Sequence, residues 1–344
     1  MSKIIKTIII LAGVLILLVV LAASIGAAGV SIGETVSIIG SYIPGVSNLI
    51  DQADLDPKSL VVISQIRLPR IFMALVVGIA LASAGVIFQG LFRNPMADPF
   101  VIGVSAGGAF GAAVALFFSS SFILLNISIT TVFALIGALG TTFLVYSIAS
   151  SRGRVSVVTL LLSGIALSAM LSAMTSLVMI FKANDLARIV FWLMGGLTAA
   201  SWQKLYIITP VIILLVIISG FYMRDLNIIS MGDERAIQMG VQTEKVKKTL
   251  LVLASIIAAL AVSVSGVIGF VGLITPHILR LIVGPDHKIL FPASALAGGI
   301  VLLISDTIAR TVLMPREIPV GIITSIVGVP FFLYLLVRSR QQVF

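Results

Sequence analysis

The chain has 344 residues, of which 59% are hydrophobic and only 10% charged, and its mean hydropathy is +1.23. Soluble domains carry about 25% charged residues, so this composition excludes an ordinary soluble globular protein. The formal charge of +9 comes from basic residues that stand singly between apolar runs, which is typical of membrane-span flanks rather than of a nucleic-acid-binding surface, and the lack of cysteine excludes disulfides and thiolate metal sites.

The first apolar run begins after Lys6 and continues without a charge to Gly33. Within it, residues 8–28 are long enough to cross a bilayer, since a transmembrane helix needs about 20 apolar residues. A secretory signal also places basic residues before an apolar run, but its apolar region is shorter than this one. We therefore expect a first span that the mature protein retains.

Charge-free runs of spanning length recur along the chain, which predicts an all-α integral membrane protein with about ten transmembrane helices in one domain over residues 1–344. The runs that each make one span are residues 8–28, 71–92, 155–181, 205–223, 289–305 and 318–337. Residues 99–151 contain no charge and are too long for one crossing, so we expect two spans that turn near residues 119–126.

The run at residues 249–279 is also too long for one crossing. It would form a helix of roughly 46 Å at about 1.5 Å per residue, against about 30 Å of hydrocarbon. The residues that favour a break in this run are Gly266, Gly269, Gly272 and Pro276. We therefore predict one full span followed by one short or re-entrant span, which completes the ten.

The distribution of Lys and Arg supports this count, because cytoplasmic loops carry more of them. With ten spans and both termini in the cytoplasm, fourteen of the 22 basic residues are cytoplasmic and eight are external, whereas a single crossing at residues 249–279 gives twelve and ten. The inner set is Lys3, Lys6, Arg93, Arg152, Arg154, Arg224, Arg235, Lys245, Lys247, Lys248, Arg280, Lys288, Arg338 and Arg340. The outer set is Lys58, Arg67, Arg70, Lys182, Arg188, Lys204, Arg310 and Arg316. We expect a multi-pass protein of the cytoplasmic (inner) membrane.

Two segments between the spans have a distinct composition. Residues 189–203 are uncharged apart from their flanks, too short to span, and contain Trp192 and Trp202, which predicts a short helix at the outer membrane surface. Residues 224–248 form the one long polar stretch on the cytoplasmic side. Their composition allows either a solvated connector or a docking surface for a soluble partner.

Two patterns that could indicate catalysis or metal binding are better explained by structural roles. Residues 103–107 match the G-x-S-x-G pattern of a nucleophilic serine, but they open an apolar helix instead of a strand-to-helix elbow. Glycines recur every four residues from Gly103 to Gly111, a spacing that lets membrane helices pack closely. The two histidines, His277 and His287, are too few for a metal site, so we predict neither a metal site nor enzymatic activity.

Asp306 directly follows the predicted span at residues 289–305, and it lies four residues before Arg310. On a helix the two side chains face the same side and can form an ion pair near the outer end. The alternative is a proton relay in a secondary transporter driven by an ion gradient, because such transporters need ionisable groups within the membrane. The residues leave both interpretations open.

Eight segments then form a pattern that composition alone does not supply. They are RLPR (67–70), FQGLFRNPMADP (88–99), LLSGIA (161–166), MGDERAIQMGV (231–241), GFVGLITPHILR (269–280), GPDHK (284–288), SDTIAR (305–310) and EIPVGIIT (317–324). In this order they resemble the FecCD family, the permeases of bacterial and archaeal ABC importers for ferric siderophores, haem and cobalamin. The resemblance implies a type II ABC importer permease fold, with ten membrane helices per subunit and two subunits around a central path.

The resemblance also implies roles for particular residues. Arg67, Arg70 and Arg310 match arginines that dock carboxylates of a substrate-binding protein, for which a planar guanidinium is suited. Residues 225–247 match the coupling helices that rest against an ATPase. The coupling residues are Gly232, Asp233, Glu234, Arg235, Ala236 and Gly240. The translocation path and its cytoplasmic gate are expected at Asn94, Met96, Val157 and Val158. The family has small polar residues at the last two positions, where an apolar pair could instead close the path by dewetting.

The implied partners are a second permease subunit, identical or paralogous, two cytoplasmic ABC ATPase subunits, an extracytoplasmic substrate-binding protein and the lipid bilayer, with no nucleic acid. The chain itself is expected to bind no cofactor, because ATP is used by the partner ATPase. Its expected function is to translocate a metal chelate such as a ferric siderophore, haem or cobalamin across the cytoplasmic membrane.

Overall fold

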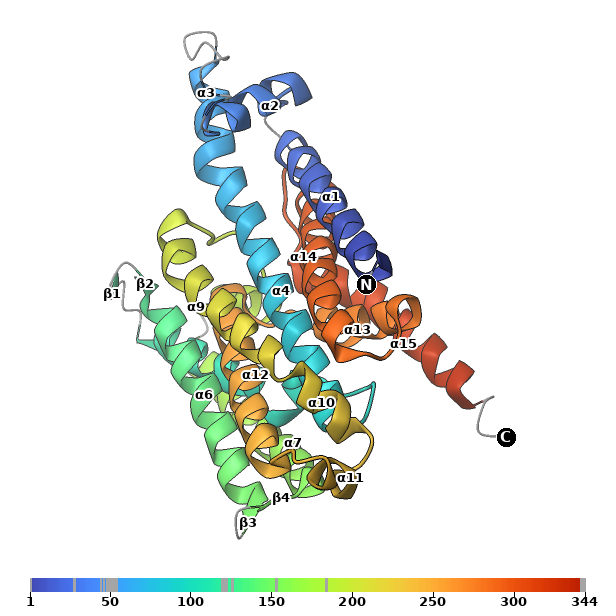
Figure 1. Cartoon of the computed structure of the whole chain (residues 1–344). Coiled ribbons are helices and arrows are strands. Elements are labelled where there is room, and N and C mark those ends of the chain that lie inside the picture. The colour runs from blue at the N-terminus through green and yellow to red at the C-terminus, as the bar shows by residue number, and fades with distance from the viewer. Residues whose placement is uncertain are drawn as a thin grey trace.

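The structure is a computed structural model that describes residues 2–26, 29–43, 45, 47, 55–118, 123–124, 127–151, 154–182 and 185–340. In these ranges, seven helical segments are long and apolar enough to cross a membrane, and three shorter apolar helices accompany them. They form one bundle (Figure 1). Its helices are α1 (Ser2–Ser24), α4 (Leu68–Leu91), α5 (Val104–Phe117), α6 (Ile129–Ala149), α7 (Val157–Phe181), α9 (Trp202–Phe221), α12 (Thr243–Ser265), α13 (Val271–Val283), α14 (His287–Thr311) and α15 (Val320–Arg340).

Short elements connect these helices. They are α2 (Ile32–Ser41), α3 (Pro57–Val61) and the π-helix η3 (Val62–Arg67) before α4, the 3₁₀-helix η4 (Pro99–Ile102) before α5, α8 (Leu186–Leu193) before α9, and α10 (Met223–Ser230) and α11 (Asp233–Gln238) before α12. Two antiparallel hairpins lie at the ends of α6: β1 (Ile123–Leu124) with β2 (Ile127–Ser128), and β3 (Ser150–Ser151) with β4 (Arg154–Val155). In register, Ile123 pairs with Ser128 and Ser150 pairs with Val155.

Three sequence predictions fall wholly or partly outside the described residues. The turn expected at residues 119–126 is described only at 123–124, and Arg152 of the inner charge set is not described. The ends of the chain, at residues 1 and 341–344, are not described either.

The second predicted span begins earlier than expected. The continuous helical segment Pro57–Leu91 has 35 residues, whereas the charge-free run started at residue 71. Asp56 caps its start by accepting a hydrogen bond from the Ser59 amide at 2.9 Å, and Pro57 occupies the first helical turn. The helix continues through Arg67 because its guanidinium donates hydrogen bonds to the carbonyl oxygens of Ala23 and Ser24, contacts that the local sequence does not reveal.

The break predicted at residues 249–279 lies between α12 and α13. Gly266 ends α12 with a φ of 68°, and an added Cβ there would lie 2.2 Å from the Trp192 carbonyl oxygen, so glycine is required for the turn and for the contact. Gly272 and Pro276 lie inside α13 and do not form the break. The short outer helix predicted at residues 189–203 is also smaller, because Trp202 is the first residue of α9.

Glycines allow the central helices to approach closely. An added Cβ at Gly78 of α4 would lie 2.2 Å from the Gly298 carbonyl oxygen of α14. One at Gly107 of α5 would lie 2.3 Å from the Gly137 carbonyl oxygen of α6, so the G-x-S-x-G run serves helix packing. The segment that contains α4 is the most enclosed span, with 89% of its most apolar stretch buried, whereas the corresponding value for α7 is 11%. The α7 helix therefore presents an apolar surface outward.

Candidate functional site

Two groups of charged side chains lie at opposite ends of the bundle. The arginine cluster, made of Arg67, Arg70, Asp306, Arg310 and Glu317, lies where α1 and α14 end and the α4 segment begins. The coupling segment, residues 225–247, lies at the other end, where α9 ends and α12 begins (Figure 1). We refer to these as the arginine end and the coupling end.

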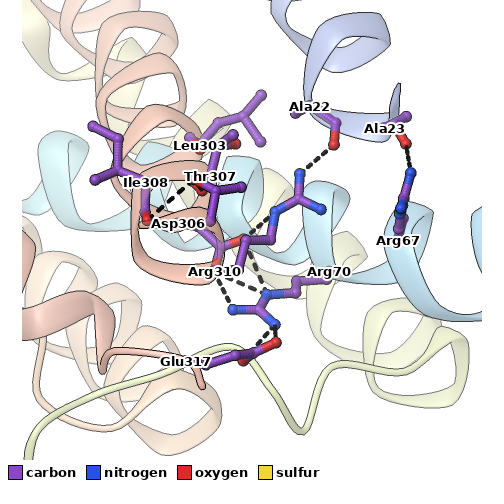
Figure 2. A network of polar contacts seen from close by, with 11 residues as sticks. Ala22, Ala23, Arg67, Arg70, Leu303, Asp306, Thr307, Ile308, Arg310 and Glu317 are labelled. Carbon is purple, nitrogen blue, oxygen red and sulfur yellow. Dashed lines mark hydrogen bonds and ion pairs between the residues drawn. The ribbon is translucent and has the colours of Figure 1, made fainter. Parts of the chain in front are cut away.

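Arg70 is the centre of the arginine cluster. Its Nε donates to both Asp306 oxygens at 2.9 and 3.0 Å, and its Nη1 donates to both Glu317 oxygens at 2.9 and 2.8 Å (Figure 2). Asp306 has no exposed side-chain surface, whereas Glu317 is 41% exposed. Arg70 therefore ties α4 to α14 through a buried pair and to the segment before α15 through a surface pair.

The predicted ion pair between Asp306 and Arg310 is present but is the weaker contact. The Arg310 Nε lies 3.9 Å from Asp306, whereas the Arg70 Nη2 lies 2.9 Å from it. Asp306 and Arg70 are 236 residues apart in the chain. The four-residue spacing on one helix predicted the pair of Asp306 with Arg310. It could not predict the pair with Arg70, which lies on another helix.

Arg67 and Arg310 cap the end of α1. The Arg67 Nη1 donates to the carbonyl oxygens of Ala23 at 2.6 Å and Ser24 at 3.0 Å, and the Arg310 Nη2 donates to the Ala22 carbonyl (Figure 2). The last carbonyls of a helix lack partners within it and carry partial negative charge, so cations are favoured there. The two side chains thereby attach α1 to α4 and α14.

The burial of these arginines bears on their predicted docking role. Arg67 is 5% exposed and Arg310 is 9% exposed, so in this conformation both present little surface to a partner. The Arg70 side chain is 11% exposed and meets the surface beside Glu317. Docking by the three arginines stays a prediction, and Arg70 is the best placed of them.

A recess of ≈ 430 Å³ adjoins Arg70 at the arginine end. Its wall includes Arg70, Arg188, Trp192, Lys204 and Glu317. The Lys204 Nζ donates to the Ala199 carbonyl at 2.8 Å. Sequence analysis missed this recess because segments far apart in the chain form its wall.

At the coupling end, the glycines Gly232 and Gly240 bound α11. Gly232 precedes the helix with a φ of 123°, and Gly240 follows it with a φ of 82°, backbone conformations that favour glycine. Asp233 and Glu234 occupy its first turn, where negative charge is favoured. The role of these residues in coupling is not tested by this geometry and stays a prediction.

Asp233 attaches α11 to the bundle. Its carboxylate pairs with Arg93, which follows α4, and with Lys247 of α12. Partial burial raises the pKa of Asp233, but Lys247 and Arg93 together lower it more, so the pKa lies below its ordinary value. One carboxylate thus holds α11 against two other segments of the coupling end.

Three large apolar side chains of this segment are exposed. Met231 is 59% exposed, and Ile237 and Met239 are each 61% exposed. Ala236, also predicted as a coupling residue, is fully buried in the hydrophobic core, and its role in coupling stays a prediction. Sequence analysis missed the three exposed side chains, although large apolar residues within the one long polar stretch were a usable signal.

Two of the predicted gate residues, Asn94 and Val157, line different recesses. Asn94 lines a recess with Arg280 and His287, whereas Val157 lines another with Tyr146 and Lys248. The Asn94 Oδ1 accepts a hydrogen bond from the Met96 amide at 2.9 Å. Val157 is 38% exposed and Val158 is 66% exposed at the start of α7. A gate built from these four positions stays a prediction.

Within the part of the chain that the structure describes, no group of three or more His, Asp or Glu residues could hold a metal ion. Ser105, the central residue of the G-x-S-x-G run, is in α5 with its Oγ buried and without a hydrogen-bond partner among the described residues.

A solved structure of a metal-chelate type ABC transporter in an inward-facing conformation shares this architecture. It superposes with a TM-score of 0.83 at 33% sequence identity, covering 97% of this chain and 99% of the other. The chain therefore has the predicted fold class, an all-α integral membrane permease fold, and is a multi-pass membrane protein.

Sequence relatives agree with the structural match. The chain is 44% identical over 281 residues to the cobalamin import system permease protein BtuC of Halobacterium salinarum, covering 82% of this chain and 74% of the relative. It is 42% identical over 280 residues to the hemin transport system permease protein HmuU of Yersinia pestis, covering 80% and 83%. The FecCD transport family matches residues 14–338, and the chain therefore belongs to this family, as a permease that works with other ABC transporter subunits.

Proposed function

We propose that this chain is the permease subunit of an ATP-driven importer that moves a metal chelate, such as a ferric siderophore, haem or cobalamin, across the cytoplasmic membrane. The names of the relatives and the metal-chelate type of the structural neighbour support this cargo class. The proposed partners are a second permease subunit, identical or paralogous, two cytoplasmic ATPase subunits and an extracytoplasmic binding protein. The chain binds no cofactor and catalyses no reaction, and the ATPase hydrolyses ATP.

One observation carries the ATP-driven mechanism. The coupling segment exposes Met231, Ile237 and Met239 at a polar end of the bundle, while Asp233 anchors the segment to α4 and α12. Exposed apolar side chains on a firmly held helix suit a soluble partner, because burial in a partner groove removes them from water. A force applied to α11 would pass to the spanning helices through Asp233.

The alternative, a secondary transporter driven by an ion gradient, is less well supported. Asp306 was the candidate proton carrier, but its carboxylate is engaged by Arg70 through two hydrogen bonds. The carboxylate is thereby occupied in a structural ion pair that joins α4 to α14.

Uptake in reconstituted vesicles separates the two mechanisms. The permease is reconstituted with its ATPase and binding protein, and accumulation of the chelate is measured with ATP inside or with a non-hydrolysable analogue. We expect uptake to require hydrolysable ATP and to continue when proton and sodium gradients are collapsed. Gradient-dependent uptake by the chain without an ATPase would refute the proposal.

The proposed orientation has the arginine end outside and the coupling end in the cytoplasm, with both termini in the cytoplasm. The distribution of Lys and Arg in the sequence supports it. In this orientation the single permease domain, residues 1–344, presents residues 225–247 to the ATPase. The path between the two subunits would pass Asn94, Met96, Val157 and Val158.

We propose that docking of the binding protein at Arg70 displaces Glu317. A partner carboxylate needs the guanidinium edge that Glu317 occupies at 2.8 Å. Exposed pairs are worth about 0.2–1 kcal/mol, so Glu317→Gln should strengthen binding of the binding protein by up to about fivefold. Titration calorimetry measures this, with Glu34→Gln as the control. Weaker binding by Glu317→Gln would contradict the exchange.

A further inference from the structure

A second recess, of ≈ 470 Å³, lies at the coupling end. It is formed by the end of α4, the loop after it, α10, α13 and the start of α14. Its wall includes four charged or ionisable side chains, Arg93, Arg280, Asp286 and His287, and the amide side chains of Gln89, Asn94 and Asn227. Among the four charged or ionisable residues of this wall, Arg280 has contacts that differ from the rest.

Arg280 is a half-buried cation without a counter-ion. Its Nη2 donates to the Gln89 Oε1 at 3.2 Å, and no carboxylate lies within 4.0 Å of it in the described ranges. Gln89 is 2% exposed and its Nε2 donates to the Leu273 carbonyl at 3.0 Å, which fixes the amide with its oxygen toward Arg280. The hydrogen bond to Gln89 holds the guanidinium in place. Because a guanidinium has five N–H donors, most of them are still available.

Most other polar groups of the recess already have partners among the described residues, and the exception is the neutral ring nitrogen Nε2 of His287, which is buried and has none. The Asn227 Oδ1 accepts from the His287 backbone amide at 2.9 Å, and its Nδ2 donates to Asp286 at 2.6 Å. Asp286 also accepts from the Lys288 amide at 3.0 Å, as the cap of α14. Arg93 pairs with Asp233. Arg280 is therefore the charged group of this wall that an added anion would complete.

The position of the recess indicates where such an anion would come from. One wall is α10, which is followed by the exposed Met231 and leads directly into α11 with its exposed Ile237. Arg93 belongs to the recess and also pairs with Asp233 of α11. A soluble subunit seated on α11 would therefore extend over the mouth of the recess.

We infer that Arg280 receives a carboxylate from the ATPase partner, an aspartate or glutamate side chain that enters this recess when α11 docks. The inference rests on the proposed function and adds a second contact to it. A guanidinium binds a carboxylate through two parallel hydrogen bonds, and pairing removes the cost of a half-buried charge. The contact links the ATPase to α13 and to the loop at Asn94, in addition to α11.

Photo-crosslinking of the full complex tests the position. The chain contains no cysteine, so Ser230→Cys, in the wall of the recess, can carry the only benzophenone label. Irradiation should link the permease to an ATPase peptide that contains an Asp or Glu, identified by mass spectrometry. Crosslinks to lipid or to the chelate alone, with none to the ATPase, would overturn the inference.

Charge variants test the pairing. Arg280→Gln should weaken ATPase binding by about tenfold or more and reduce its dependence on salt, as expected for a lost buried charge pair, and Arg280→Lys should restore part of both. Lys288→Gln, an exposed cation outside this recess, is the matched control and should change neither. Unchanged affinity and salt dependence in Arg280→Gln would overturn the inference. If Ile237→Ser still weakened assembly in that case, the proposed function would stand.

Discussion

At the scale of single residues, charges in this protein are neutralised by partners that are distant in the sequence. Asp306 has no exposed side-chain surface and is held by Arg70 of another helix. Arg67 and Arg310 are instead held by carbonyl oxygens at the end of α1. Because each buried charge has a specific partner, loss of one member leaves the other unsatisfied in a medium of low dielectric.

Asp306→Asn should therefore destabilise the protein strongly. Removal of one member of a buried ion pair typically costs about 3–5 kcal/mol, because the remaining charge is left uncompensated. Thermal unfolding of the purified protein in detergent measures the effect. Asp185→Asn is the control, since its pairs with Lys182 and Arg188 lie at 3.6 Å near the surface and should be worth under about 1 kcal/mol. Equal losses in the two variants would contradict the structural role of Asp306.

Asp98, in the loop between α4 and α5, gives a pH-dependent prediction. Burial raises its pKa to about 6, although a hydrogen bond from the Phe100 amide at 2.8 Å opposes the shift. A raised carboxyl pKa destabilises the fold increasingly as pH rises from the unfolded value of 3.8 to about 6, and the loss is complete above that. Asp98→Asn keeps the acceptor, so it should gain about 1–3 kcal/mol over the native protein at pH 7.5 and little at pH 4. Unfolding temperatures of both proteins across this range provide the measurement, and a pH-independent difference would contradict the shift.

At the scale of elements, the sequence was sufficient to predict helices whose composition is set by the bilayer. The run predicted at residues 155–181 is α7 (Val157–Phe181), because a span must be apolar over its whole length. The α4 segment was predicted too short because Arg67 was taken as a flank, and its neutralising carbonyls belong to α1. Arg280 escaped notice for the same reason, since its contact, Gln89, is 191 residues away. Spans could be predicted locally, but sites depended on contacts between distant segments.

The exposed Ile237 of α11 also belongs to this scale. Ile237→Ser should weaken ATPase binding by about tenfold or more, because burial of such a side chain contributes roughly 1.5–3 kcal/mol. The unfolding temperature of the free permease should not change, since Ile237 is 61% exposed there. Gln238→Ser, an exposed neighbour on the same helix, is the control. Normal ATPase affinity in Ile237→Ser, measured with purified subunits, would remove α11 from the interface.

At the scale of the whole molecule, the order of the helices assigns every loop to one of two ends. Because α12 and α13 are separate helices joined by the break at Gly266, Lys288 at the start of α14 lies at the coupling end. A single crossing over residues 249–279 would instead have placed Lys288 at the arginine end. The side of the membrane on which Lys288 lies therefore tests both the count of ten spans and the orientation.

Single cysteines in the cysteine-free chain provide this test. Lys58 and Arg188, at the arginine end, are exposed, as are Arg235 and Lys288 at the coupling end, whereas Arg67 and Arg310 are too buried to be labelled reliably. In intact cells, a membrane-impermeant maleimide should label Lys58→Cys and Arg188→Cys, and should label Arg235→Cys and Lys288→Cys only after permeabilisation. Labelling of Lys288→Cys alone from outside would contradict the separate crossing of α13. Labelling of both coupling-end cysteines from outside, with neither at the arginine end, would show that the orientation is the reverse of the proposed one. Residues 225–247 would then lie outside the cell, where no cytoplasmic ATPase could reach them.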